Sequence, residues 1–533
     1  MNEAALLQKI EILEEQIKTL ENDNAKKDST ILKLEEKVKL LQFLHYGRKS
    51  EKLTKEDTLT GSLFNEAEDA AFQQYDPVMT EQVKKTIEIG PQTRTIKEKV
   101  GRKPFDASLP REEKVYDLSD EEKICACGHE LKCIGEDVTE RLKIVPPKVT
   151  VLREIRKKYV CEYCEGLERE DEKGVVTAEG VKHLIAGSMA DESLLAWSIS
   201  EKFEFALPFY RQAIRLKQIG SPIPRATLSN LIIAVSEKCK PLYRLLKQHL
   251  LSGPLINGDE TRVQVLKEPG RKNELLSWMW VFLGGARGKE CVYFQYEESR
   301  SHDIAYEFLK GYSGLFQSDD YEVYHTAIRK LKNENRSDIR HFLCWAHVRR
   351  YFYLYWESTK KTDTEAEGIL DIIKDIFALE ELRSQFPEDE FLKKRKEKAD
   401  KLFERLRSKL IELFPQAPPG LALGKAIAYT LDNWEQLVSY VDYYEVTPSN
   451  NAAERAIRPF VIGRKNWLFS GSPRGANASA ILYSLVESAK LHGLKPFEYM
   501  YYILRKLPYC HNDADYAALL PFNITPEQLQ SVR

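Results

Sequence analysis

Apolar residues recur at alternating spacings of four and three between Leu6 and Leu41, which is a heptad repeat. The a positions carry β-branched residues and one asparagine, and the d positions carry leucine except at Lys27. This pattern favours two parallel strands, and a buried Asn24 fixes register and dimeric state. The sequence therefore predicts a coiled-coil zipper over residues 1–46 that forms a parallel homodimer. The alternative is a lone amphipathic helix packed on its own domain.

The next two segments lack heptads. Residues 47–110 mix charges, Gly, Pro and Gln without periodicity, which predicts a linker. Residues 111–175 hold two cysteine pairs joined by alternating stretches, a pattern typical of a zinc ribbon with one structural Zn²⁺. The first pair is tighter than the usual knuckle and leaves Cys133 or His129 as substitute ligands; the alternative is a small sheet with incidental cysteines. The expected ligands are Cys125, Cys127, Cys161 and Cys164.

Residues 176–245 contain three helical patterns, and the last two are separated by a turn at Gly220 that is rich in proline. This spacing predicts a helix-turn-helix DNA-binding domain. Between Leu207 and Asn230 the chain carries four basic residues and no carboxylate, which suits DNA phosphates. The alternative is a three-helix packing module without DNA contact. The expected DNA contacts are Arg211, Arg215, Lys217, Arg225 and Thr227.

From residue 250 to 350, strand patterns come first in succession and then alternate with helices, which predicts a mixed α/β sheet of the RNase H-like kind. The last of these strand segments reads IRHFLCWAHV. Asp259 follows the apolar run LING, and Asp319 follows LFQS, so both are expected at strand ends. A carboxylate there is well placed to hold a divalent ion. The alternative for either residue alone is a surface turn acid.

Residues 351–445 are helical and charged, and are interpreted as an insertion in the sheet domain. Residues 446–505 resume that domain with a helix that opens on the capping run TPSNN and carries Glu454. Residues 506–533 are expected to be a C-terminal tail. Basic and aromatic residues beside Glu454 suit phosphates and unpaired bases, although a helix cap with ordinary surface charges is the alternative. The expected DNA contacts here are Arg458, Arg464, Lys465 and Trp467.

Composition adds limits to this outline. The 533 residues carry 80 basic and 82 acidic side chains, so DNA contacts must come from local clusters and not from a net positive charge. The most apolar run, Leu275 to Gly285, is too short to span a bilayer, which predicts no membrane partner. The acidic N-terminus does not resemble a secretory signal, and the few cysteines do not form a disulfide scaffold. The expected location is the cytoplasm, in association with the nucleoid.

Ordered strings along the chain resemble a known family. They are GRKSEKL, CGHEL with YVCEYC, LPFYRQ with TLSN, GDET, QSDDYEVY, CWAHVRRYF, NNAAERAIRPFVIGRKNWLFSGS and ALLPFN. Over nearly its whole length the chain resembles the large, TnpC-type transposase of the bacterial insertion-sequence family numbered sixty-six. The resemblance implies a DDE triad at Asp259, Asp319 and Glu454, together with two small accessory proteins of the same element. The family's usual glycine after the second Asp is Asp320 here, so the ligand is either Asp319 or Asp320.

Such a triad suits phosphodiester chemistry. Two Mg²⁺ or Mn²⁺ ions per active site stabilise the attacking and leaving oxygens of an in-line displacement. We expect Asp259 to bridge both ions, Asp319 to hold one and Glu454 the other, with water and then a DNA 3′-hydroxyl as nucleophiles. Arg458 and Lys465 are expected to clamp phosphates, and His347, Arg349 and Arg350 are candidates for a supporting role.

The function expected is therefore a DNA transposase that binds the terminal inverted repeats of its insertion sequence, cleaves strands and joins them to target DNA. The zipper would pair two protomers, as a homodimer or a higher oligomer. Two alternatives stay open: a catalytically inactive dimeric DNA-binding protein, and an RNase H-like nuclease that cleaves without joining.

Overall fold

The computed structural model describes residues 149–160 and 175–530, together with the single positions 27, 31 and 38. The described residues from Thr150 onward belong to one compact unit, and a second unit, residues 73–149, lies outside the description apart from Val149. The predicted linker and the four ribbon cysteines therefore lie outside the described residues. So does the predicted zipper, except for those three positions.

The centre of the described unit is a mixed sheet in the order β5-β4-β3-β6-β7. Its first three strands pair antiparallel through short connections, whereas β6 pairs parallel with β3, and β7 pairs parallel with β6. Parallel neighbours need a crossover, and α8 (His302–Leu309) and α9 (Glu322–Asn333) supply the two crossovers. The mixed sheet predicted from the sequence is present. Its strands are β3 (Leu255–Val265), β4 (Leu276–Gly284), β5 (Cys291–Glu297), β6 (Gly314–Ser318) and β7 (Ile339–Leu343), with β8 (Phe469–Ser470) beside the far end of β3.

Helices cover both faces of this sheet. On one face Phe308 of α8 stacks on Phe282 of β4, with ring centroids 3.5 Å apart. On the other face Phe460 of α15 (Asn451–Trp467) packs 6.3 Å from Phe294 of β5. Because side chains alternate along a strand, successive residues of β3 face α9 and α15 in turn. Gly258 faces the side covered by α8 and α9, where a Cβ atom would lie 2.8 Å from the Phe316 ring.

Helix α16 (Pro473–Leu491) covers the outer edge of β5. The backbone N–H of Phe294 donates to Ser484 Oγ at 2.8 Å, and that of Val292 donates to Ser488 Oγ at 2.9 Å. The two serines lie one helical turn apart, so they meet alternate residues of the strand. A sheet edge that would otherwise present open N–H groups is thereby satisfied.

The helices before the sheet share its hydrophobic core. The predicted helix-turn-helix elements are present as α5 and α6, joined by a turn in which Gly220 has φ +87° and Ile223 is buried. Helix α4 packs on α17, and α6 packs on α16, so these helices join the main core. Leu216, Ile223 and Leu228 form a small core of their own between α5 and α6. The bounds are α4 (Glu192–Phe203), α5 (Phe209–Gln218), α6 (Arg225–Lys238), α7 (Lys240–Leu251) and α17 (Pro496–Lys506).

The chain after Lys506 is the segment predicted to be a C-terminal tail. It forms α18 (Asp513–Ala518) and α19 (Pro526–Gln530), and Leu520, Ile524 and Leu529 are buried in the main core. These helices pack on α7 and α17. Their apolar residues are too few and too widely spaced to show a helical periodicity in the sequence.

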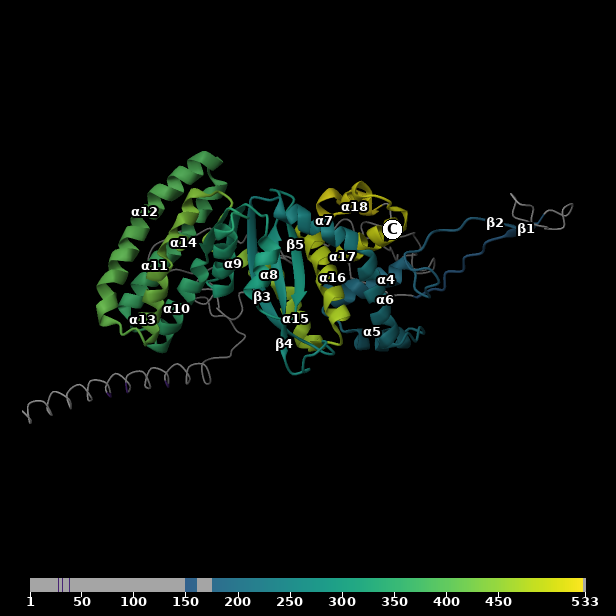
Figure 1. The fold of residues 1–533 in the computed structure, drawn as a ribbon, viewed down its shortest axis with the longest axis horizontal. Helices are drawn as coiled ribbons and strands as arrows, with labels where there is room; N and C mark the ends of the chain where they lie inside the picture. Colours follow the sequence, from purple (N-terminus) through teal and green to yellow (C-terminus); the bar gives the residue numbers. More distant parts are fainter. Residues whose placement is uncertain (1–26, 28–30, 32–37, 39–148, 161–174, 531–533) are drawn as a thin grey trace, which may run out of the picture. The chain divides into compact units, whose positions relative to one another are not determined.

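The inserted helices have a second hydrophobic core, and Figure 1 draws them in green beside the sheet. Helix α10 begins at Trp345, directly after β7, so the segment IRHFLCWAHV is a strand only as far as Leu343. The helices are α10 (Trp345–Ser358), α11 (Thr364–Ala378), α12 (Glu388–Leu413), α13 (Ala422–Asp432) and α14 (Trp434–Val438). Short 3₁₀ turns are η1 (Leu379–Ser384), η2 (Phe414–Gln416) and η3 (Ser439–Asp442) here, and η4 (Leu507–Tyr509) and η5 (Pro521–Asn523) near the C-terminus.

Residues 149–157, part of an alternating stretch between the two cysteine pairs, do not form a strand. The pairing that follows them joins β1 (Lys158–Val160) to β2 (Val175–Thr177). Val151 is 94% exposed, so the alternation has no packed face within the described residues. Among the residues that the structure describes, no helix is both long enough and apolar enough to cross a membrane.

A buried arginine fixes the end of the insertion. The Arg395 guanidinium on α12 is fully buried and donates to Glu380 at 3.1 Å. It also donates to four backbone carbonyls at 2.8 to 3.1 Å, and these belong to the segment that leads into α15: Tyr440, Val441, Tyr443 and Val446. The insertion thereby sets the path of the chain before Glu454.

Replacing Arg395 by alanine should lower the free energy of unfolding by roughly 3 kcal/mol, because several buried acceptors lose their donor. Urea denaturation followed by tryptophan fluorescence measures this change, since Trp345 and Trp434 lie in the same core. Arg405→Ala, an exposed change on the same helix, should stay within about 0.5 kcal/mol of wild type. Equal losses in the two variants would contradict the anchoring role.

Candidate active site

Three buried amide side chains connect two strands to the start of α15. Asn257 of β3 donates through Nδ2 to Gln317 Oε1 at 2.9 Å and to Asn450 Oδ1 at 3.0 Å. Asn450 in turn donates to the Gly258 carbonyl at 2.8 Å, and Gln317 donates to the Thr447 carbonyl at 2.7 Å. All three side chains are at most 4% exposed. A fully bonded buried network of this kind specifies one arrangement of the elements that it joins.

The predicted carboxylates follow these amides at fixed intervals. Asp259 and Asp319 each come two residues after a network amide, and Glu454 comes four residues after Asn450. Two residues along a strand and four along a helix return to the same face. Asn257 and Gln317 are register partners on adjacent strands. Asp259 and Asp319, each two residues further along, are therefore expected on the same face of the sheet and near each other.

The charges of Asp319 and Glu454 act on Asp259, although the three carboxylates do not form a group with metal-ligand spacing within the described residues. Burial raises the pKa of Asp259 well above its usual range, and the charges of Glu260, Glu454 and Asp319 act in the same direction. The backbone N–H of Glu260, which donates to Asp259 Oδ1 at 2.8 Å, acts against them. Negative charge is therefore concentrated around Asp259.

Asp259 does not lie at a strand end, contrary to the prediction. It is the fifth residue of β3, which continues to Val265 beside β4. The pairing of β3 with β6 ends at Asn257, so β3 continues past its shorter neighbour and Asp259 lies just beyond the last paired position. Asp319, as predicted, follows directly after β6.

The two neighbouring aspartates have different surroundings. Asp320 accepts from His325 Nε2 at 2.7 Å and from Asn433 Nδ2 at 2.9 Å, so both of its oxygens are engaged. Asp319 Oδ1 is buried and has no hydrogen-bond partner among the described residues. An ionised carboxylate oxygen in that state is an acceptor that lacks a donor or a cation. Asp320 instead ties α9 to the C-terminal end of α13.

A fourth carboxylate lies on the opposite face of β3. Glu260 has a side chain that is only 1% exposed, and it accepts from Arg300 and from the Tyr324 hydroxyl. Burial raises the pKa of Glu260, and the bonds to Tyr324 and Arg300 oppose that rise. Arg300 is held between the rings of Tyr321 and Trp278. Glu260 is therefore compensated within the protein, unlike Asp259.

Oxygen donors around the carboxylates fit a hard divalent cation. Asn451 Oδ1 at the first turn of α15 is, like Asp319 Oδ1, buried without a partner within residues 149–160 and 175–530. Carboxylate and amide oxygens are the ligands that Mg²⁺ and Mn²⁺ take in proteins. The donor set of Asp259, Asp319 and Glu454, with Asn451 nearby on the same helix, is consistent with the predicted metal chemistry.

Glu454 also belongs to a second group of metal-ligand types. Ligand atoms of Cys344, His347 and Glu454 all lie within 4.8 Å of one another. Cys344 is the N-cap of α10, and the Asn450 N–H donates to its Sγ at 3.1 Å. Burial raises the pKa of the Cys344 thiol to about 12, and the charge of Glu454 adds to that rise. His347 was among the residues predicted from the sequence and Cys344 was not, although the Cys-x-x-His spacing at a helix start is a pattern of metal-ligand residues.

The predicted phosphate contacts of α15 differ in exposure. Arg458 is only 6% exposed, so its guanidinium lies inside the protein and does not have the open position expected of a phosphate clamp. Arg464 is half-buried and donates to Thr261 Oγ1 at 3.1 Å, and burial lowers its pKa. Lys465 is exposed.

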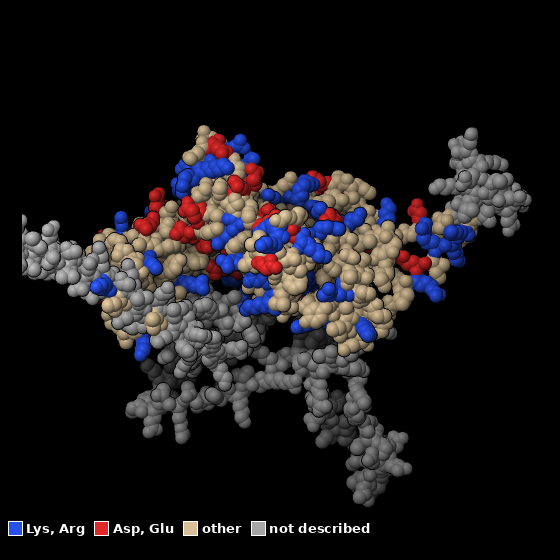
Figure 2. Space-filling model, turned by 60° about the horizontal axis from the view of Figure 1, so that its bottom comes forward, with Lys and Arg blue, Asp and Glu red and all other residues tan. Residues whose placement is uncertain are grey.

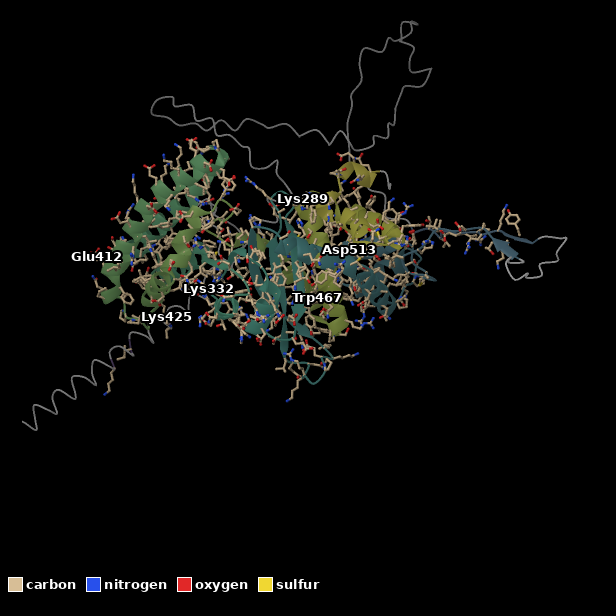
Figure 3. The ribbon with its side chains drawn as sticks, turned by 45° about the horizontal axis from the view of Figure 1, so that its top comes forward. Lys289, Lys332, Glu412, Lys425, Trp467 and Asp513 are labelled. Atoms are coloured by element: carbon tan, nitrogen blue, oxygen red, sulfur yellow. The ribbon has the colours of Figure 1, made fainter. Side chains whose placement is uncertain are left out.

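Trp467, labelled in Figure 3, ends α15 and already has ring partners. The Phe460 ring lies edge-on with centroids 5.3 Å apart, and Lys202 Nζ lies 5.2 Å from the indole centroid. The ring therefore packs between α15 and α4 and does not present an open stacking surface.

The basic residues of the helix-turn-helix are also divided. Arg215 pairs with Glu201 at 3.0 Å and lies over Trp197, and Arg211 lies over Tyr210. Lys217 and Arg225 are exposed on either side of the turn, and Thr227 is half-buried. In the view of Figure 2, Lys and Arg are interspersed with Asp and Glu over the described surface, in keeping with the balanced composition.

Asp259→Asn should stabilise the metal-free protein at neutral pH, because burial and the neighbouring acids disfavour the charged form of Asp259 and raise its pKa. The folded-state pKa is above the unfolded one, so the wild type loses stability as pH rises through the folded pKa. The advantage of the variant should therefore grow with pH and vanish in acid. Asp320→Asn should instead destabilise by roughly 1 to 3 kcal/mol, because it loses charge-assisted bonds. Thermal unfolding in chelator measures both, and the same direction of shift in both variants would contradict this division.

Sequence comparisons place these features in a family. The family model described as Transposase IS66 family matches residues 187–478, which is more than half of the chain. The IS66 C-terminal element matches residues 484–522, and the zinc-finger binding domain of transposase IS66 matches residues 122–165, which include all four predicted zinc ligands. A zinc finger is thus confirmed as a domain, and its ligands stay a prediction. Transposase C of IS166 homeodomain matches residues 33–113, so a recognisable domain covers most of the segment predicted to be a linker.

Relatives in Sinorhizobium fredii (strain NBRC 101917 / NGR234) align with most of the chain. Uncharacterized protein y4jD is 33% identical over 409 residues, which are 75% of this chain and 78% of the relative. Uncharacterized protein y4qI is 30% identical over 444 residues, 80% of this chain and 78% of the relative. With a family match over more than half its length, the chain belongs to the IS66 transposase family.

Proposed function

We propose that this protein is a DDE transposase that binds the ends of its insertion sequence and performs metal-dependent strand cleavage and strand transfer. The proposal rests on the burial of Asp259, on which the charges of Asp319 and Glu454 act, and on the buried unpaired Oδ1 of Asp319. A structural role alone does not account for a buried aspartate whose charged form the neighbouring acids disfavour.

The sheet supports an RNase H-like catalytic domain. Three antiparallel strands followed by two parallel ones, in the order β5-β4-β3-β6-β7, are the arrangement that this interpretation requires. The first Asp lies on the central strand, the second directly follows the neighbouring strand, and the Glu lies on a helix against β3. The inserted helices α10 to α14 separate the second Asp from the Glu in sequence.

Each acidic residue has a distinct part in the proposed chemistry. Asp259, Asp319 and Glu454 would hold divalent ions, which supply charge stabilisation to the attacking and leaving oxygens of the phosphodiester. The amide network keeps the three side chains in place, so little reorganisation is needed when DNA binds. Asp319, and not Asp320, is the proposed second ligand, because Asp320 already accepts two hydrogen bonds. Water and then a DNA 3′-hydroxyl act as nucleophiles, and no covalent protein intermediate is involved.

DNA recognition is assigned to exposed basic residues. Lys217 and Arg225 flank the helix-turn-helix turn, and Lys465 lies on the last turn of α15. Such residues position a duplex by phosphate contacts and carry no sequence information by themselves. The zinc ribbon and the N-terminal zipper would add end recognition and pair two protomers, and accessory proteins of the same element are expected partners. Cytoplasmic location follows from action on the bacterial nucleoid.

Asp259→Asn and Asp319→Asn should each lower metal-dependent cleavage and joining on the order of 1000-fold or more, because each loses several kcal/mol of transition-state stabilisation. The assay uses supercoiled DNA that carries the flanking sequences of the gene, with Mg²⁺ or Mn²⁺ and the accessory proteins. Asp320→Asn is the matched control and should retain activity within about tenfold, provided that it remains folded.

Specific end binding without cleavage under any metal would refute the catalytic proposal and favour the inactive DNA-binding protein. Cleavage without joining would favour the nuclease. Loss of activity in Asp320→Asn alone would reverse the choice between the two neighbouring aspartates.

Lys217→Ala and Arg225→Ala should each reduce the salt dependence of DNA binding by roughly one unit of the log–log slope, because each removes a phosphate contact. Fluorescence anisotropy across a series of salt concentrations measures the slope. Lys425→Ala on α13 is an exposed control that should leave it unchanged. An equal effect at all three positions would point to general charge and not to this turn.

A further inference from the structure

Cys344, His347 and Glu454 lie together because hydrogen bonds join the start of α10 to the start of α15. Cys344 and His347 occupy the N-cap and the first turn of α10, three residues apart, which places them on one face of the helix. The Trp345 N–H donates to the Pro448 carbonyl at 2.7 Å, and the Asn450 N–H donates to Cys344 Sγ at 3.1 Å. The start of α10 is thereby fixed against the start of α15, which carries Glu454.

The ligand atoms already have nearly the spacing of a metal site. A tetrahedral zinc site with a Zn–S distance of about 2.3 Å and Zn–N and Zn–O distances of about 2.0 to 2.2 Å separates its ligand atoms by roughly 3 to 4 Å. The three ligand atoms here lie within 4.8 Å of one another. Side-chain rotations that move these atoms by about 1 Å would bring them to the spacing of a zinc site. In the part of the chain that the structure describes, this is the one such group of three.

A second observation also points to a ligand. His347 Nδ1 is buried and has no hydrogen-bond partner in the described region. Metal-binding histidines need such a nitrogen lone pair. Cys344 is fully buried, whereas His347 and Glu454 are only partly buried, so the thiol is shielded while a fourth position stays accessible to water.

The donor chemistry distinguishes this group from the centre at Asp259. Thiolate and imidazole select Zn²⁺ and related borderline ions, whereas carboxylate oxygens select Mg²⁺ and Mn²⁺. Glu454 is common to both groups, because its charge acts on Asp259 and on Cys344.

We propose that Cys344, His347 and Glu454 form a separate zinc site, with a fourth position open to water, and that zinc bound there withdraws Glu454 from the catalytic carboxylates. Zinc binding is a property of these residues alone. Its inhibitory consequence rests on the proposed function, since it requires Glu454 to act with Asp259 and Asp319. The site is distinct from the zinc-finger domain at residues 122–165.

The test uses the full chain, stripped of metal, reloaded with Zn²⁺ and freed of excess by gel filtration. Elemental analysis should find one zinc fewer per chain in Cys344→Ser than in wild type. Serine is a preferred N-cap residue, so this change keeps the start of α10 while removing the thiolate. His347→Gln is a second variant, and it should cause the same loss. Co²⁺ as a probe should show a thiolate charge-transfer band that Cys344→Ser weakens and that excess Mg²⁺ does not remove.

Two controls separate this site from other thiols. Cys291→Ser changes another buried thiol, which contacts the Leu246 carbonyl, and should leave the zinc content unchanged. Cys161→Ser with Cys164→Ser should lose the zinc of the finger and keep the one at Cys344. Equal zinc content in wild type, Cys344→Ser and His347→Gln would overturn the proposal.

Cleavage assays then test the consequence. Micromolar zinc added to the Mg²⁺ reaction should inhibit wild type at least tenfold more strongly than Cys344→Ser. Equal inhibition of both, with the extra zinc demonstrated, would overturn the withdrawal of Glu454 while leaving the site intact. If no cleavage occurs at all, the proposed function fails, and the zinc count still decides the site independently.

Discussion

The buried amide network of Asn257, Gln317 and Asn450 is the constraint on which the candidate active site depends. These side chains hydrogen-bond to one another and to the backbone across β3, β6 and the start of α15. Buried amides without partners would each cost about 1 to 3 kcal/mol, so the three elements are held in the one arrangement that satisfies them all. Asp259 and Asp319 come two residues after a network amide on their strands, and Glu454 comes four residues after Asn450 on its helix. Each acid therefore lies on the same face of its element as the amide before it. Repulsion among the acids is tolerated because the network fixes the backbone beneath them.

The inserted helices contribute to the same geometry. Arg395 binds the carbonyls of the segment before α15, and Asn433 at the end of α13 binds Asp320. Cys344 at the start of α10 receives the N–H of Asn450. The insertion therefore contacts both sides of the site, next to the second Asp and before the Glu. Its separate hydrophobic core allows it to act as a rigid support for the chain that returns to the sheet.

The sequence was informative where local patterns carry the signal. The strands, the crossover helices and the position of Asp319 follow from apolar runs and turns, and the family follows from ordered motifs. The position of Asp259 within a long strand was missed, because nothing local shows that β6 is shorter than β3. The burial of Arg458 and the ring contacts of Trp467 were missed for a similar reason: both depend on elements distant in sequence. Asn257 and Gln317 left a faint signal, as lone amides inside apolar strands two residues before each Asp.

The measurement that tests the central claim most directly is Mn²⁺ binding followed by electron paramagnetic resonance, with wild type, Asp319→Asn and Asp320→Asn compared at equal protein concentration. Mn²⁺ reports on the oxygen ligands themselves, without DNA ends, accessory proteins or turnover. We expect Asp319→Asn to weaken Mn²⁺ binding at least tenfold and Asp320→Asn to leave it near the wild-type value. Equal affinity in all three proteins would contradict the assignment of these carboxylates as a metal centre.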